Sequence, residues 1–159
     1  MIMPMVRHPI STCPMPKSEF ANTAIAAVFA KFTKPVRGRL IDIRHMIFDV
    51  ASTTTGVGQI EGALRWGQPS YLTSQSGSGS TIRLGTLRGH EDSSVLFFHC
   101  QSGLADEFRQ IYGSRLLIEG NRSLVFRNDA PLPEPELRHC IGLALTYHRR
   151  KRSRSAAKA

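Results

Sequence analysis

Several features of membrane and secreted proteins are missing from this chain of 159 residues. No apolar run approaches the length of about 20 residues that a bilayer span needs. Prolines interrupt the N-terminal stretch and no small-residue cleavage site follows, which argues against a secretory signal peptide. The three cysteines, Cys13, Cys100 and Cys140, have no disulfide or zinc-site spacing, so we expect buried, apolar cysteines in a reducing compartment. These absences predict a cytoplasmic protein without a membrane segment.

The sequence also lacks the local motifs of common catalytic and metal sites. It has no C-x-x-C or H-x-x-x-H pair, and the neighbours His99–Cys100 and His139–Cys140 diverge on a strand or a helix, so neither pair chelates one ion. The run Ser76–Ser80 lacks the Lys-Ser/Thr that follows in a phosphate loop, and no G-x-S-x-G is present. We therefore predict a non-enzymatic protein, and no particular cofactor is indicated.

Acidic residues are absent from the C-terminal end. The formal net charge is +9, and residues 149–159 hold six Lys or Arg without an acid, which leaves +3 for residues 1–148. Such a segment attracts phosphates without sequence preference. It also has the composition of a solvated, disordered end. We predict a disordered basic tail over 149–159 and keep non-specific nucleic-acid association as an alternative function, through Arg149, Arg150, Lys151, Arg152 and Arg154.

Apolar spacing predicts one α+β domain over residues 18–148, after a flexible lead-in over 1–17. Helical spacing marks residues 19–32 with Ser18 as N-cap, a second helix after Thr33, and helices over 103–112 and from Pro135 onward. Alternating spacing marks strands over 81–88, 93–100 and 123–126, with a hairpin connection at 88–94 and a flexible connection at 74–80. Grouped strands favour two layers, a mostly antiparallel sheet with helices packed on one face.

The alternation assigns side chains to the two faces of that sheet. We expect the helices to cover Ile82, Leu84, Leu96, Phe98, Leu124 and Phe126. The other face then carries Arg83, Val95, Phe97, His99, Val125 and Arg127. Because it mixes apolar and basic groups, we predict a shallow binding or homodimer surface for an anionic or aromatic partner. Ordinary strand charges on an exposed sheet are the alternative.

Five motifs occur in a fixed order, WGQPSY at 66–71, FFHC at 97–100, FR at 108–109, EGNRSLVF at 119–126 and ALTYH at 144–148. Together they resemble the YdhG-like family, a domain-of-unknown-function family, over about residues 28–148. The resemblance implies a single α+β domain with an antiparallel sheet and helices against one face. Some members are described as iron chaperones with a frataxin-like role, so the resemblance also implies iron delivery as an alternative function.

The WGQPSY motif predicts a shaped turn that carries aromatic side chains. Gly67 permits a backbone turn where a Cβ would clash, and Pro69 holds the preceding residue extended. Trp66 and Tyr71 then stand in fixed positions. They form either part of the core, with the indole N–H bonded to a carbonyl, or the aromatic wall of a ligand pocket.

The EGNR motif, residues 119–122, predicts a chain reversal before a strand, since Gly and Asn tolerate left-handed backbone. Glu119 pairs with Arg122 across the turn, or Arg122 binds a carboxylate or phosphate of a ligand. We predict that the chain binds a small ligand or a partner through the WGQPSY and EGNR region. The candidate residues are Trp66, Gly67, Pro69, Tyr71, His99, Glu119, Asn121 and Arg122.

A weaker metal alternative lies on the second helix. Asp42, His45 and Asp49 fall on its polar side and offer oxygen and nitrogen ligands, as iron delivery would require. The polar face of any amphipathic helix has the same composition.

Overall fold

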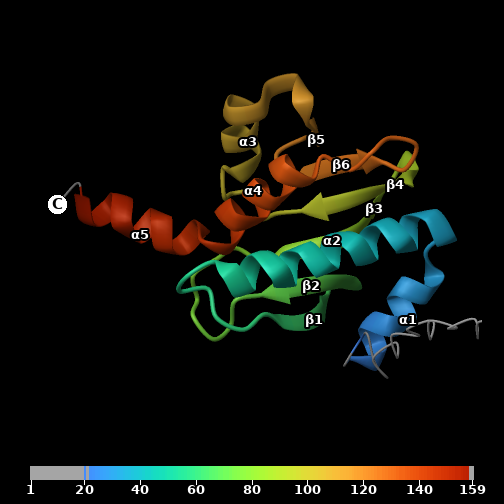
Figure 1. Cartoon of the computed structure of the whole chain (residues 1–159), viewed down its shortest axis with the longest axis horizontal. Coiled ribbons are helices and arrows are strands. Elements are labelled where there is room, and N and C mark those ends of the chain that lie inside the picture. Colours follow the sequence, from blue (N-terminus) through green and yellow to red (C-terminus); the bar gives the residue numbers. More distant parts are fainter. Residues whose placement is uncertain (1–19, 21, 158–159) are drawn as a thin grey trace, which may run out of the picture.

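A sheet of six antiparallel strands and five α-helices make up the computed structural model, which describes residue 20 and residues 22–157 (Figure 1). The helices are α1 (Thr23–Lys31), α2 (Lys34–Thr53), α3 (Leu104–Tyr112), α4 (Glu134–Leu145) and α5 (Tyr147–Ala157), with a 3-10 turn η1 (Gly113–Arg115). The strands are β1 (Glu61–Arg65), β2 (Gln68–Leu72), β3 (Ile82–Leu87), β4 (His90–Phe97), β5 (Leu117–Glu119) and β6 (Ser123–Arg127). This architecture confirms the predicted α+β domain. The lead-in, Cys13 and Ser18 lie outside the described residues.

The sheet has the strand order β1-β2-β3-β4-β6-β5, and every neighbouring pair is antiparallel. Helices α2 and α4 lie side by side across one face of it (Figure 1). Their buried apolar residues join those of the sheet in one core, together with residues of α1 and α3. The sheet side of this core includes Tyr71, Ile82, Leu84, Leu96, Phe98, Leu124 and Phe126. The predicted helix-facing set of strand residues therefore lies where the alternation placed it.

The first two helices begin as their sequences dictate. The Asn22 side chain accepts hydrogen bonds from the backbone N–H groups of Ala24 and Ile25, so Asn22 caps α1. In α2 a proline occupies the first turn, where no backbone donor is needed. The stripe from Val36 to Val50 is buried along the whole helix, as its spacing predicted.

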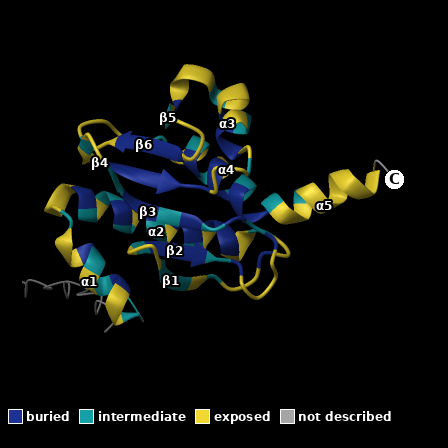
Figure 2. Cartoon of the chain, turned by 180° about the vertical axis from the view of Figure 1, so that it is seen from behind, coloured by how far each residue is buried: buried dark blue, intermediate teal, exposed yellow. Residues whose placement is uncertain are grey.

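The opposite face of the sheet holds a second, smaller apolar cluster of Val95, Phe97 and Val125. These side chains are covered by their neighbours, and Phe97 exposes only 5% of its surface. Figure 2 views the molecule from this side, where the strands are mostly buried although none of the described helices lies over them. The predicted separation of the two faces is correct, but Phe97 offers little apolar surface to a partner. Arg127 is engaged by Asp129 at 2.7 Å.

Periodicity did not predict three of the strands, and it placed the bounds of β4 differently. Residues 61–72 form the β1–β2 hairpin, where the sequence predicted only a turn, and Leu117–Glu119 form the short strand β5. The connection predicted at 88–94 is confined to Arg88 and Gly89, because β4 starts at His90. The same strand ends at Phe97 rather than at Cys100. Cys140 is buried as expected, whereas Cys100 is exposed.

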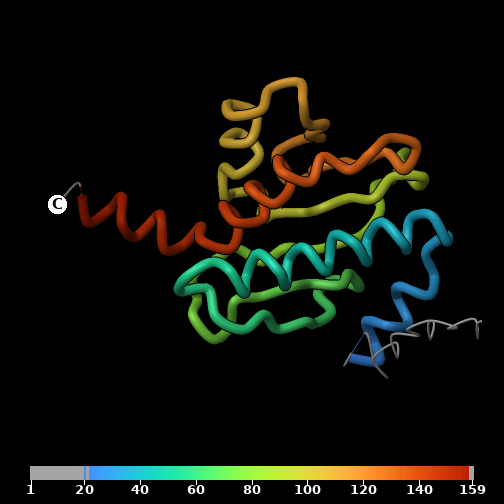
Figure 3. Tube along the Cα trace, in the orientation of Figure 1, coloured from blue at the N-terminus to red at the C-terminus, as the bar shows by residue number. Residues whose placement is uncertain are grey.

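The serine-glycine segment at 74–80 is a defined structure, not the flexible connection that its composition predicted. It runs beyond the end of the sheet from β2 to β3 (Figure 3). The Ser80 N–H donates to the Ala144 carbonyl at 2.8 Å, and the Ser78 hydroxyl donates to the Leu145 carbonyl at 2.7 Å. Carbonyls in the last turn of a helix have no partner within the helix. The segment therefore closes the C-terminal end of α4, which explains why these serines are buried.

The basic tail differs from its prediction as well, because its residues up to Ala157 form helix α5. No residue of α5 is buried, so apolar spacing gave no signal for it (Figure 2). Arg, Lys and Ala are strong helix formers, and contacts near the start of α5 attach it to the domain. None of the helices in the described part of the chain combines the length and the apolar character that a bilayer span requires.

Candidate functional site

The β1–β2 hairpin turns through only two residues, Trp66 and Gly67. Arg65 pairs with Gln68 across the turn, and both turn residues have positive φ, 50° and 72°. Two positive φ angles in a two-residue hairpin are the signature of a type I′ turn, which favours Asn-Gly. For an L-residue such as tryptophan this conformation costs about 1–2 kcal/mol. Trp66 is the only non-glycine residue with positive φ in the described part of the chain.

The strained turn holds the indole in solvent. Trp66 exposes 84% of its surface, so it is no part of the core. Its ring lies over the guanidinium of Arg83, with the guanidinium carbon 5.0 Å from the ring centroid. The same guanidinium is 5.9 Å from the Phe97 ring, and it donates to the Gln68 side-chain carbonyl at 3.3 Å. Arg83 is therefore fixed between two strands with its charged end beside the indole.

A pocket of about 480 Å³ opens next to this pair, which we call the tryptophan pocket. It is lined by Arg65, Trp66, Thr81, Arg83, His99, Cys100 and Arg122. Among the described residues no Asp or Glu lines it. Burial, and in addition the nearby Arg122 guanidinium, lower the pKa of Arg83 from its ordinary value, while Cys100 acts in the opposite sense. A bound anion would relieve this repulsion between guanidinium groups.

Two backbone bonds place the remaining polar groups. The N–H of Phe98 donates to the Arg122 carbonyl at 2.7 Å, which fixes Arg122 beside the end of β4. The N–H of Gln101 donates to Nδ1 of His99 at 3.2 Å. Because Nδ1 accepts this bond, a neutral His99 ring carries its proton on Nε2. The pocket thus combines guanidinium donors, an imidazole and one exposed aromatic face.

The structure brings three of the predicted site residues together, Trp66, His99 and Arg122, and separates the others from them. Tyr71 lies in the core with 1% exposure, and burial raises its pKa to about 12. Pro69 is buried within β2, opposite Leu64. Gly67 shapes the turn without lining the pocket.

The EGNR turn does not contain the predicted pairing of Glu119 with Arg122. The Glu119 carboxylate instead lies 3.7 Å from Nε2 of His90, and Asn121 is exposed. The turn itself is held by Arg109, whose guanidinium donates to the Gly120 carbonyl. Only Arg122 of this motif reaches the tryptophan pocket.

Four residues that line the pocket were not predicted as site residues, Arg65, Thr81, Arg83 and Cys100. The alternation predicts Arg83 on the face of the sheet opposite the helices, and this was the signal in the sequence that could have identified it as a site residue. Thr81 lies two residues before Arg83, directly ahead of the same strand, so alternation places it on the same face. Arg65 is the last residue of β1, and Cys100 follows the end of β4. Both line the pocket because the pairing of the strands brings these two ends together, which local spacing does not reveal.

The residues of the metal alternative line a different, larger hollow of about 730 Å³ between α2 and the start of α4. Asp42, His45 and Asp49 are exposed there, and Arg138 forms an ion pair with Asp49. Within residues 20 and 22–157 no three His, Cys, Asp or Glu side chains form a group that would hold a metal ion. Arginines at this hollow, Arg39 and Arg138, oppose a cation electrostatically.

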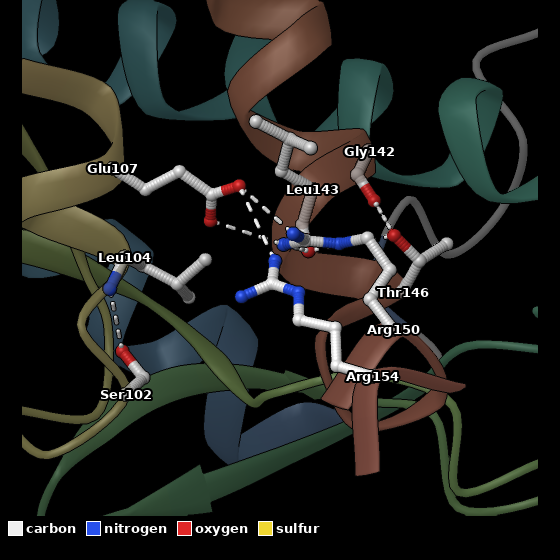
Figure 4. Close-up of polar contacts among 8 residues, drawn as sticks. All are labelled: Ser102, Leu104, Glu107, Gly142, Leu143, Thr146, Arg150 and Arg154. Atoms are coloured by element: carbon white, nitrogen blue, oxygen red, sulfur yellow. Dashed lines mark hydrogen bonds and ion pairs between the residues drawn. The ribbon is translucent and has the colours of Figure 1, made fainter. Parts of the chain in front are cut away.

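Two of the predicted nucleic-acid residues, Arg149 and Arg150, attach α5 to the domain. The guanidinium of Arg150 donates to both carboxylate oxygens of Glu107, at 2.8 and 3.2 Å, and to the Leu143 carbonyl at 2.8 Å (Figure 4). Arg149 donates to the Thr55 carbonyl through its side chain. Lys151, Arg152 and Arg154 are exposed. Arg154 also approaches Glu107, with a nitrogen–oxygen distance of 4.0 Å.

The strained turn makes a prediction about stability. We expect Trp66→Asn to raise the free energy of unfolding by about 0.5–1 kcal/mol, because Asn-Gly suits the type I′ turn and the relief of strain exceeds the lost cation–π contact. Urea denaturation followed by circular dichroism measures this change. Trp66→Phe keeps both the strain and an aromatic ring and should leave stability almost unchanged. A destabilised Trp66→Asn variant would show that the indole supports the fold.

Comparisons of the chain with protein-family models, with curated proteins and with solved structures found no match, so the geometry of the site stands as the basis for a functional assignment.

Proposed function

We propose that this chain is a non-enzymatic binding domain whose ligand is a small anion with a planar group, held in the tryptophan pocket. One observation carries the proposal: Arg65, Arg83 and Arg122 line a pocket of about 480 Å³ together with the exposed indole of Trp66. Among the described residues no Asp or Glu lines this pocket. Guanidinium groups bind carboxylates and phosphates through paired N–H donors, and an aromatic face stacks on planar groups. Membership of the YdhG-like family is part of this proposal, and the α+β fold agrees with it.

The strain at Trp66 supports a binding role. A positive φ on a large residue persists only where the surroundings enforce it, and such outliers cluster at ligand sites. Here the exposed side chain gives little core packing in return. A function that needs the indole in this position accounts for the residue, whereas stability alone favours Asn.

The chain offers its own probe, because Trp66 is its only tryptophan. Titration with a nucleoside monophosphate should change the intrinsic fluorescence, since the base stacks on the indole and the phosphate reaches Arg83. Arg83→Ala should weaken this binding by about 10- to 100-fold, the loss expected for hydrogen bonds to a charged group. The matched control is Arg88→Ala, which removes the same charge at the far end of the β3–β4 hairpin.

Inorganic phosphate and the free nucleoside separate the two halves of such a ligand. Each alone should bind more weakly than the monophosphate, because each uses only one of the two features of the pocket. The proposal fails if nucleoside monophosphates, aryl carboxylates and aryl sulfonates all leave both the fluorescence and the thermal midpoint unchanged.

A further inference from the structure

The tryptophan pocket adjoins a second hollow, of about 310 Å³, that lies against helix α5. The two share Thr81 and His99 as lining residues, and the second hollow extends to His148 and Lys151. In the part of the chain that the structure describes, neither hollow is lined by Asp or Glu. We call the two adjoining hollows the cationic groove, with Trp66 at one end and Lys151 at the other.

The charges along this groove come from separate parts of the sequence. Arg65 ends β1, Arg83 lies in β3, Arg122 precedes β6 and Lys151 lies in α5. The attachment of α5 gives Lys151 its place, because Arg150, the preceding residue, is held by Glu107 and the Leu143 carbonyl (Figure 4). A row of cations across strands and a helix can contact several phosphates of one strand in addition to the anion held in the tryptophan pocket.

We infer that the groove binds a short stretch of single-stranded nucleic acid, with a base stacked on Trp66 and the phosphates running past Arg83 and Arg122 toward Lys151. This inference rests on the proposed function, because it uses the same pocket as the terminal subsite. Sequence-tolerant binding of single strands needs an aromatic platform and a positive track. Trp66 supplies the platform with 84% exposure, and the arginines supply the track. A duplex keeps its bases stacked on one another and offers none to the indole.

Oligothymidylates of increasing length test the extension separately from the pocket. Fluorescence of Trp66 reports occupancy of the terminal subsite, and anisotropy of a labelled strand reports total binding. We expect an oligomer of about 8 residues to bind at least about 10-fold tighter than the mononucleotide, and to lose affinity with a log–log salt slope of up to about −3 for four phosphate contacts. Trp66→Ala should weaken the oligomer by about 5- to 100-fold.

The variant Lys151→Ala distinguishes the groove from the pocket. It should weaken the oligomer several-fold and leave mononucleotide binding unchanged, because Lys151 lines the hollow beside α5 and does not line the tryptophan pocket. Its matched control is Arg152→Ala, the next exposed cation of α5, which lines neither hollow. Equal effects of the two variants would reveal diffuse attraction to α5 and would overturn the groove.

Three further outcomes would also overturn the inference. A mononucleotide that binds as tightly as the oligomers would leave the proposed pocket intact and remove the extension. A polyglutamate peptide that competes as well as a single strand of similar length would assign the groove to acidic polypeptides instead. Oligomer binding without any change in Trp66 fluorescence would remove both the terminal subsite and the inference built on it.

Discussion

Gly79→Ala is expected to lower the free energy of unfolding by about 3 kcal/mol, the upper end of the usual cost of overpacking. A Cβ at this position would lie 2.5 Å from the Cα and carbonyl carbon of Leu145, a backbone segment at the end of α4 that has little freedom to shift. The φ of Gly79 lies outside the left-handed region, so the expected loss is steric and owes nothing to backbone conformation. Movement of the segment would also break the bonds from Ser78 and Ser80 to α4.

Thermal unfolding measures this effect as a fall in the midpoint of about 6–12 °C for a domain of this size. Gly38→Ala is the control, because Gly38 is exposed in α2 and a Cβ there meets nothing within 4 Å. That substitution should raise stability by up to about 1 kcal/mol through helix propensity. A Gly79→Ala variant within about 0.5 kcal/mol of the parent would show that the segment and the end of α4 separate easily.

Arg150→Ala should cost about 2 kcal/mol, the second-largest loss that we expect. The guanidinium makes two bonds to Glu107 and one to the Leu143 carbonyl, and the two side chains of the ion pair expose only 23% and 28% of their surface. Partial burial keeps solvent from screening the pair as it does at the surface. Removal of Arg150 also leaves the Glu107 carboxylate and the carbonyl short of a donor.

Chemical denaturation of Arg150→Ala, Glu107→Gln and the double variant measures the coupling between the two side chains, which we expect to be about 1–2 kcal/mol. Arg152→Ala, which removes an exposed charge from the same helix, should change stability by less than about 0.5 kcal/mol. Additive effects of the two single substitutions would mean that the ion pair does not attach α5.

Periodicity predicts those helices and strands that bury one apolar face against the core. Helix α2 and strands β3, β4 and β6 each present a regular apolar stripe to the core, so their type followed from the sequence. The hairpin at 61–72 could not be predicted in this way, because Trp-Gly is an unusual sequence for a type I′ turn. In addition, a proline such as the one in β2 typically argues against a strand. Helix α5 has no apolar stripe, and its position depends on a contact from Arg150 to a residue 43 positions away.

The sequence named some of the residues that line the candidate site, but it did not predict the full set of lining residues. The sequence left open whether Trp66 belongs to the core or to a pocket wall, and whether Arg122 pairs with Glu119 or binds a ligand; both residues line the pocket. Arg65 and Cys100 join them only through the order of the strands, which local spacing does not encode. Conversely, Tyr71 and Trp66 stand five residues apart along a strand and its turn, and they point to opposite sides of the sheet, one into the core and one into solvent.

The strand order gives the tryptophan pocket a further property. Strands β1 to β4 follow one another as a meander, whereas β6 joins them from the C-terminal part of the chain by pairing with β4. Arg83 belongs to the meander, and Arg122 belongs to the segment that joins it. A ligand that touches both guanidinium groups therefore acts as a cross-link between two separate stretches of chain. Its binding free energy then becomes part of what keeps β4 and β6 together.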